Sequence, residues 1–218
     1  MLPPYAELHC LSNFSFLRGA SHPDELVQRA QALEYAALAI TDECSLAGVV
    51  RAHLAAKEAS LPLVIGSEIM LDDGTKIVLL VTDRASYGNL AQLITRGRRN
   101  AAKGSYALCR DDVAAFAEGL LVLWVPPDLR KTGSEPTTSP ATPPQFDPLR
   151  EKSSSTLLSA ARWVAATFPA RAWLAVELFA GAGDRVRLAR SEALARAAGL
   201  PRMAAGDVHM HVRARRPL

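Results

Sequence analysis

The feature that most constrains the fold of this chain is the alternation of short apolar runs with longer segments of helical pattern. Runs that predict buried strands lie at residues 5–10, 37–41, 63–71, 76–81, 120–125, 173–179 and just before residue 207. Helical segments are expected at residues 21–33, 46–59, 86–99, 110–117, 156–168 and 184–198. Repeated strand and helix units predict an α/β fold with a parallel sheet, either open or closed into a barrel. The turn signal Asp72-Asp73-Gly74 indicates that the third and fourth strands form a hairpin.

A long interruption divides this pattern between residues 126 and 156. The segment holds seven of the 14 prolines, many serines and threonines, and few apolar residues. Because proline removes backbone donors and the segment has little to bury, it predicts a flexible excursion. It could separate two domains, but the strand and helix alternation resumes afterwards with the same character. We therefore expect one domain over residues 1–218 with a flexible loop at about 126–156.

Composition and charge restrict the class of protein. The 218 residues are 49% hydrophobic and carry 25 Lys and Arg against 22 Asp and Glu, which excludes a disordered or fibrous chain. No apolar run is long enough to cross a bilayer and no signal peptide is recognisable, so we expect a cytoplasmic location and no membrane partner. Cys10, Cys44 and Cys109 are odd in number and far apart, which favours reduced thiols. The excess positive charge lies from Arg202 onward, so bulk charge gives no argument for nucleic-acid binding.

Polar side chains of metal-binding type follow four of the predicted strands. They are His9 after the first, Asp42 with Glu43 after the second, Glu68 at the third, and Asp207 with His209 near the end. Imidazoles and carboxylates that converge at strand ends are what a polynuclear Zn, Mn or Mg site requires. Taken one at a time, the same residues also fit structural roles as strand caps, helix caps, edge residues or turns. Both interpretations stay open on these residues alone.

Several motifs, in matching order and spacing, resemble one family. They are Leu8-His-Cys-Leu-Ser-Asn-Phe-Ser-Phe-Leu17 with Gly19-Ala20, Ala37-Leu-Ala-Ile-Thr-Asp42 followed by Leu46-Ala-Gly48, Ile65-Gly-Ser-Glu68, Tyr87-Gly-Asn-Leu90 and Gly206-Asp-Val-His209. The set resembles the polymerase and histidinol phosphatase (PHP) domain, and more narrowly the N-terminal domain of bacterial DNA polymerase III alpha subunits. The ending from Gly206 to Leu218 is similar to the error-prone, damage-inducible translesion branch of that family. The resemblance implies that the chain is a fragment of a longer polymerase.

The resemblance also implies a fold and a ligand set. The family fold is a distorted seven-stranded (β/α) barrel whose strand C-termini bind up to three metals. Members with an intact set hydrolyse phosphoesters and can act as metal-dependent 3′–5′ exonucleases, while others are silent and support the polymerase core. The matching positions in this chain are His9, Glu68, Asp207 and His209. Four other positions depart from the family pattern: Leu11, Glu43 and Lys76 stand where histidines are expected, and Arg18 stands where an aspartate is expected.

These departures change the expected chemistry. A leucine has no lone pair to donate, while arginine and lysine bring positive charge into a cavity meant for cations. We therefore expect no three-metal centre, at most one weakly bound Zn, Mn or Mg among His9, Glu68 and Asp207, and no catalytic residue in this fragment. The favoured function is a catalytically silent domain that scaffolds the polymerase module. The alternatives are an active metal-dependent phosphoesterase or 3′–5′ exonuclease, and a nucleic-acid-binding module that uses the basic residues near the end, Arg213, Arg215 and Arg216.

Polymerase chemistry itself is expected outside this sequence. Nucleotidyl transfer needs clustered aspartates that hold two Mg ions, and no Asp-x-Asp pair lies on a predicted strand. The Mg-dependent polymerase activity of the parent protein should therefore lie beyond Leu218. The expected partners are the rest of the polymerase chain, DNA through the parent protein, and translesion accessory proteins.

The substitutions also predict specific contacts. Carboxylates in a cleft that has lost its metals must be offset by other positive groups, because desolvated charges without partners are costly. Arg18 is expected within hydrogen-bonding distance of Glu43, and Lys76 is expected to reach Glu68. The alternative is that both long side chains simply point to solvent.

Overall fold

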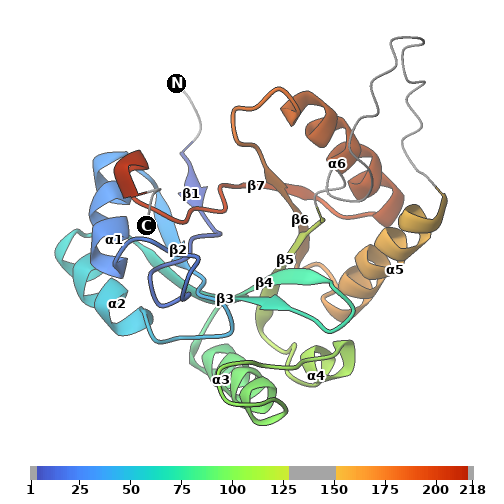
Figure 1. Cartoon of the computed structure of the whole chain (residues 1–218), viewed down its shortest axis with the longest axis horizontal. Helices are drawn as coiled ribbons and strands as arrows, with labels where there is room; N and C mark the ends of the chain where they lie inside the picture. The colour runs from blue at the N-terminus through green and yellow to red at the C-terminus, as the bar shows by residue number, and fades with distance from the viewer. Residues whose placement is uncertain (1–3, 128–150, 216–218) are drawn as a thin grey trace.

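The computed structural model describes residues 4–127 and 151–215, with the side chains of 151–154 left out. Seven strands form one sheet in chain order (Figure 1). The strands are β1 (Ala6–Glu7), β2 (Ala37–Ile40), β3 (Leu63–Met70), β4 (Lys76–Val81), β5 (Leu120–Val125), β6 (Ala172–Glu177) and β7 (Arg202–Ala205). The helices are α1 (Pro23–Ala32), α2 (Val49–Glu58), α3 (Arg84–Arg99), α4 (Arg110–Ala115), α5 (Glu151–Thr167) and α6 (Asp184–Ala198), followed by a 3-10 turn, η2 (Arg213–Arg215).

Strand direction decides which residues meet at the two ends of the sheet. β1, β2 and β3 are parallel, β4 is antiparallel to both β3 and β5, and β5, β6 and β7 are parallel. Six strands therefore end on the same side, and β4 begins there. Because β4 runs in the opposite direction, its first residue, Lys76, lies at the same end as the last residues of the other strands.

The sheet is almost closed into a barrel. After β1, Cys10 forms a parallel bridge with Val208, which follows β7. The amide of Leu11 donates to the carbonyl of Val208 over 2.8 Å, and the amide of Val208 donates to the carbonyl of His9 over 2.9 Å. The distorted seven-stranded α/β barrel expected from the family resemblance is therefore the observed architecture.

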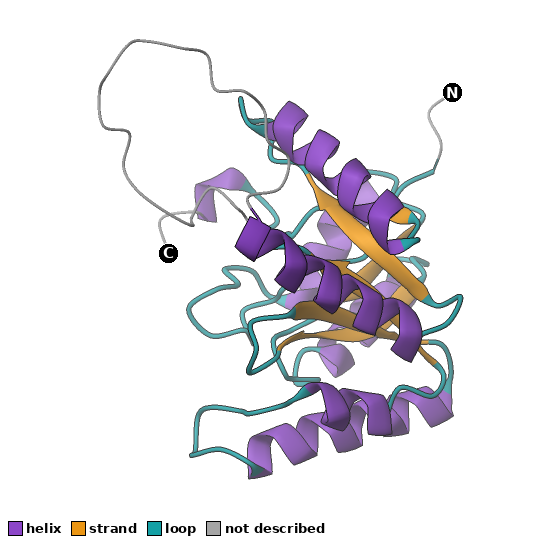
Figure 2. Cartoon of the chain, turned by 90° about the vertical axis from the view of Figure 1, so that its right-hand side faces the viewer, coloured by secondary structure: helices purple, strands orange, loops and turns teal. Residues whose placement is uncertain are grey.

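Alternation along the strands separates the barrel interior from the helix-covered outside. On β4, Val78 and Leu80 belong to an inner cluster with residues of β2, β5, β6 and β7, whereas Ile77 and Leu79 pack with residues of α3, α4 and α5. Figure 2 shows the helices outside the strands. Glu68 pairs with Val78 across the hairpin, so it shares the inward face of the sheet. The interior is thus apolar along its length and charged at the end where most strands stop.

Local signals explain the main helix boundaries. Pro23 occupies the first turn of α1, and the carboxylate of Glu25 accepts a hydrogen bond from the amide of His22 over 2.8 Å. Asp83 caps α3 by accepting from the amide of Ser86 over 2.8 Å, which starts that helix slightly earlier than expected. Gly199 ends α6 in the left-handed conformation with φ 68°.

Other boundaries also differ from the sequence expectation. The first strand, expected at 5–10, is reduced to Ala6–Glu7, and Cys10 beyond it forms an isolated bridge with Val208. α5 begins at Glu151 rather than near residue 156, where the sequence predicted its start. Most of that expected loop, residues 128–150, lies outside the described residues, and the flexible single-domain organisation stays a prediction. Within the described part of the chain, no helix has the length and apolar character to span a bilayer.

Candidate metal-site position at the strand ends

Glu68 is the centre of a buried charged cluster. It lies on β3 and is fully buried, and three side chains with basic groups surround its carboxylate. His9 Nε2 lies 2.8 Å from Glu68 Oε2, and Lys76 Nζ lies 3.0 Å from the same oxygen. The Arg18 guanidinium contacts both carboxylate oxygens, with Nη2 at 3.1 Å from Oε2. We call the following residues the Glu68 cluster: His9, Arg18, Glu43, Glu68, Lys76, Glu177 and Asp207.

The barrel explains why these residues converge. His9 follows β1, and Lys76 opens β4 at the same end of the barrel as the end of β3. Arg18 reaches the cluster from the loop that connects β1 to α1. Residues distant in sequence therefore meet because the parallel strands end on one side of the barrel, and the antiparallel β4 begins there with Lys76.

Arg18 joins Glu68 to Glu43. Its Nη1 lies 2.7 Å from Glu43 Oε2, and the hydroxyl of Tyr106 donates to Glu43 Oε1 over 3.0 Å. The contacts expected between Arg18 and Glu43 and between Lys76 and Glu68 are thus present. Arg18 goes further than expected, because it also binds Glu68 directly.

His9 has acidic neighbours on both ring nitrogens. Besides Glu68, its Nδ1 lies 2.7 Å from Glu177 Oε1 at the end of β6, and its Nε2 lies 3.6 Å from Asp207 Oδ1. His209 Nε2 lies 3.0 Å from Asp207 Oδ1. The structure therefore gathers His9, Glu68 and Asp207 into one group, while His209 contacts that group through Asp207.

The electrostatic attraction between these groups shifts their pKa values. Burial opposes the charged imidazole, but hydrogen bonds to Glu177 and Glu68 raise the pKa of His9 to about 9. Burial alone would raise the pKa of Glu68, yet its contacts with His9, Arg18 and Lys76 hold that pKa well below the usual range. For Asp207, burial is again outweighed, here by His209, His9 and Lys76, which lower its pKa to about 2. At neutral pH, His9 is positive and both carboxylates are negative.

The positions and chemistry of the possible ligand atoms show how well this cluster fits metal ions. Ligand atoms of His9, Glu68 and Asp207 lie within 4.8 Å of one another, so these three side chains could hold one ion. Such an ion would have to displace Lys76 and Arg18 from Glu68. The fit to a second or third ion is poorer, because the buried side chain of Leu11 offers no lone pair and Arg18 and Lys76 place positive charge beside Glu68.

Asp42, a strand-end acid singled out by the sequence, instead holds the loop after β1. Its Oδ1 accepts from the amide of Ser12 over 2.8 Å and from the hydroxyl of Ser15 over 2.7 Å. Its Oδ2 accepts from the hydroxyl of Ser12 over 2.7 Å. Asp42 is buried, and these bonds give it a structural role in that loop.

Two members of the site were missed by sequence reasoning. Glu177 is the last residue of β6. The sequence predicted that this strand continues to residue 179, so Glu177 was not recognised as a strand-end residue. Tyr106 lies in the long connection after α3, and nothing in its sequence context pointed to Glu43. A search for acids at the ends of apolar runs would have found Glu177, whereas Tyr106 required the tertiary fold.

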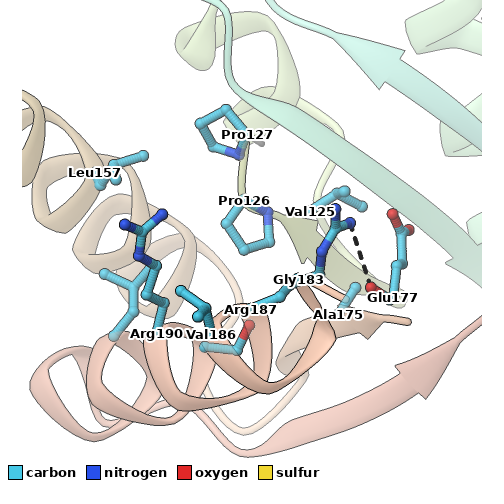
Figure 3. A pocket seen from close by; sticks show the side chains of 12 residues that line it. Val125, Pro126, Pro127, Leu157, Ala175, Glu177, Gly183, Val186, Arg187 and Arg190 are labelled. Atoms are coloured by element: carbon cyan, nitrogen blue, oxygen red, sulfur yellow. Dashed lines mark hydrogen bonds between the residues drawn. The ribbon is translucent and has the colours of Figure 1, made fainter. Parts of the chain in front are cut away.

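A separate cavity lies beside the cluster, between the ends of β5 and β6 and the helices α5 and α6 (Figure 3). It encloses about 290 Å³ and is lined by Val125, Pro126 and Leu157 together with Arg187 and Arg190. Arg187 donates to the backbone carbonyl of Glu177 over 3.4 Å. Glu177 therefore belongs to both the Glu68 cluster and the cavity: its carboxylate contacts His9, and its backbone lies at the cavity wall.

The family of the chain follows from comparison with known sequences. A family model described as the PHP domain matches residues 7–137. The chain belongs to the PHP domain family. This confirms the resemblance read from its motifs and places the Glu68 cluster in the barrel of a PHP domain.

Curated relatives of this PHP domain are larger proteins. It is 51% identical over its whole length to the error-prone DNA polymerase of Dechloromonas aromatica, and covers 19% of that protein. It is 52% identical to the error-prone DNA polymerase of Pseudomonas fluorescens, covering 98% of this chain and 18% of the relative. The chain thus spans about a fifth of the length of these relatives.

Solved structures share the fold of this PHP domain at low sequence identity. A proposed metal-dependent phosphoesterase from Bifidobacterium adolescentis superposes with a TM-score of 0.61 and 16% identity, covering 95% of this chain and 88% of the other. An amidohydrolase from Chromobacterium violaceum gives a TM-score of 0.56 and 16% identity, covering 94% and 87%. At this identity the likeness concerns the fold alone.

Proposed function

We propose that this chain is the N-terminal PHP domain of an error-prone translesion DNA polymerase, and that it is catalytically silent and supports the polymerase module. The relatives at about half identity support the first part of the proposal. The observation that carries the second part is the placement of Arg18 and Lys76 on Glu68, the most buried carboxylate of the site. Protein cations stand where a metal-dependent member needs room for ions.

The chemistry of the cluster favours silence. Metals in a phosphoesterase activate water and stabilise the attacking and leaving oxygens, and ammonium or guanidinium groups do not lower the pKa of water in that way. His9, with a pKa of about 9, is protonated at neutral pH and cannot accept a proton from water. Glu68 and Asp207, with lowered pKa values, are weak bases. The cluster lacks both the metal pair and a proton acceptor suited to neutral pH.

An assay for released nucleotides tests this proposal. The 218-residue chain is incubated with labelled single-stranded and 3′-mismatched DNA in Mg, Mn or Zn. We expect no metal-dependent release above the level of a His9→Ala variant prepared in the same way. Turnover that His9→Ala abolishes, and that a surface variant such as Glu192→Gln retains, would overturn the silent-domain proposal.

An active metal-dependent phosphoesterase or exonuclease is the second candidate. It is favoured by one observation, the convergence of His9, Glu68 and Asp207 within 4.8 Å. One weakly bound Zn, Mn or Mg would use these three side chains. The two candidates differ in a simple respect: the second requires that metal binding releases Lys76 from Glu68, and the first does not.

A nucleic-acid-binding module receives less support from the structure. Of the basic residues near the end of the chain, Arg215 donates to Glu25 over 2.5 Å. Arg216 lies outside the described residues. In the part of the tail that the structure describes, a positive charge is thus tied to α1.

The proposal for the whole protein follows from its relatives. Mg-dependent nucleotidyl transfer would be carried out by the part of the polymerase that this chain does not contain. The partners would be the remainder of that polypeptide, DNA bound through it, and translesion accessory proteins. Because a bacterial chromosome lies in the cytoplasm, we also place the protein there.

A further inference from the structure

The loop between β1 and α1 exposes a cluster of large apolar side chains. Phe16 is 84% exposed and Leu17 is 91% exposed, and the neighbouring Phe14 is 41% exposed. We call these three residues the apolar tip. Large apolar residues that are adjacent and almost fully exposed are typical of surfaces that another molecule covers.

The apolar tip stands on a rigid base. Ser12 and Ser15, both buried, are bound to Asp42, and the amide of Arg18 donates to the carbonyl of Ser15 over 3.0 Å. A Cβ atom on Gly19 would lie 1.9 Å from the carbonyl oxygen of Ser12, so only glycine allows the loop to close so tightly. These bonds tether the loop on both sides of the tip, and a tethered loop loses less conformational entropy on docking.

The Glu68 cluster takes part in this support. The backbone of Leu17 is left-handed, with φ 62°. Residues other than glycine rarely adopt this conformation, and they keep it where the surrounding structure imposes it. The next residue, Arg18, is bound to Glu43 and Glu68. The ion pairs that occupy the position of metal ligands thus also fix the backbone that carries Phe16 and Leu17.

The last described segment of the chain runs beside this loop. The amide of Ala20 donates to the carbonyl of His209 over 2.8 Å, and the amide of His211 donates to the hydroxyl of Ser21 over 2.9 Å. Figure 1 shows η2 next to α1, in agreement with the bond from Arg215 to Glu25. The curated relatives are about five times longer than this chain, so in them further polypeptide is available to cover the tip, and residues 209–211 already bind Ala20 and Ser21 at the base of the same loop.

We infer that the apolar tip is the docking surface for the remainder of the polymerase polypeptide, and that Arg18 is the residue that holds it in place. This inference rests on the proposed function as part of a longer polymerase and adds the surface through which support is given. It gives the cations of the Glu68 cluster a further role, because the contacts of Arg18 with Glu43 and Glu68 hold the loop that carries the tip. Aromatic residues such as Phe are enriched at the buried cores of protein interfaces.

Hydroxyl-radical footprinting of the full-length polymerase tests the inference within one molecule. In this domain Phe16 is more exposed than Phe179, which is 51% exposed and lies two residues after the end of β6. If the tip is docked, Phe16 should be oxidised more slowly than Phe179, on the order of fivefold, because interface cores exclude water. Oxidation of Phe16 at the same rate as Phe179 or faster would overturn the inference.

Variants sharpen this test. Arg18→Met should raise the oxidation of Phe16 in the full-length protein severalfold, because the loop loses its tether. Phe16→Ser with Leu17→Ser should make the polymerase more sensitive to proteolysis just after residue 218, whereas Leu188→Ser, an exposed leucine on α6, should not. Equal sensitivity of the double variant and the Leu188→Ser control would contradict the proposed occupant.

Other occupants give different results. Protection of Phe16 that is lost on dilution, together with a dimer in sedimentation, would assign the tip to a second copy of the chain and overturn the inference. Protection that arises only after single-stranded DNA is added would do the same. Failure of the proposed silent function would be seen separately, as metal-dependent nuclease activity, which the footprint does not measure.

Discussion

Two kinds of ion pair in this domain differ in what surrounds them. In the Glu68 cluster, a fully buried carboxylate is contacted by His9, Arg18 and Lys76. On α6, Glu192 and Arg196 form an i,i+4 pair whose side chains are 48% and 77% exposed. Water screens the charges of Glu192 and Arg196, so this pair adds little to stability. In the Glu68 cluster, a charge that lost its partner would stay buried without compensation, which is costly. The cluster is therefore where a single substitution should have the largest effect.

Replacement of the central acid should give the largest loss. Glu68→Gln leaves His9, Arg18 and Lys76 without their common buried partner, and we expect a loss of about 3 to 5 kcal/mol in the free energy of unfolding. Glu192→Gln on α6 is the matched control, with an expected change within about 0.5 kcal/mol. Urea denaturation followed by circular dichroism measures both. Equal losses for the two variants would mean that the cluster is as solvated as the surface pair.

The pH dependence of stability should reflect His9. Its pKa rises from 6.5 to about 9 on folding, so its contribution is fully present below pH 6.5 and is lost as the pH rises through 9. The loss should be about 3 kcal/mol, since His9 is fully buried and each pKa unit corresponds to about 1.4 kcal/mol. Urea denaturation from pH 6 to 9.5 measures it. The His9→Gln variant should lack this decline, and an equally steep decline in that variant would assign the titration to another group.

Removal of one cation should cost less than removal of the shared acid. Lys76→Met leaves Glu68 bound to His9 and Arg18, so we expect a loss of about 1 to 3 kcal/mol. Arg196→Met provides the exposed control, with an expected effect within about 0.5 kcal/mol. Thermal unfolding of both variants gives the comparison. An unchanged melting temperature for Lys76→Met would show that its contact with Glu68 contributes nothing to the fold.

The sequence predicted the site well where charge balance could be followed position by position. Arg18 and Lys76 replace expected ligands, and the need to offset nearby carboxylates pointed to Glu43 and Glu68 as their partners. The alternation of apolar runs similarly indicated the strands of the barrel, because strand periodicity and buried runs are local properties. These inferences required only the types of residue and their order.

The remaining contacts depend on how the barrel closes. The contact of Glu177 with His9 joins positions 168 residues apart, across β6 and β1, and local pattern does not encode it. The end of β1 is likewise not marked locally, because the apolar run continues to Cys10 while the strand stops at Glu7. Secondary structure was therefore easier to predict than which strand ends meet.

Metal content is the most direct test of the central claim that protein cations occupy the place of metals. The purified chain is dialysed against Mn or Zn, and bound metal is measured by mass spectrometry, in parallel with a variant that restores the family's ligand types through Leu11→His, Arg18→Asp, Glu43→His and Lys76→His. The account predicts that the natural chain retains no bound pair of ions and that the restored variant gains metal, because its donors again carry lone pairs. A fully occupied pair of metal ions in the natural chain, lost on His9→Ala, would contradict it.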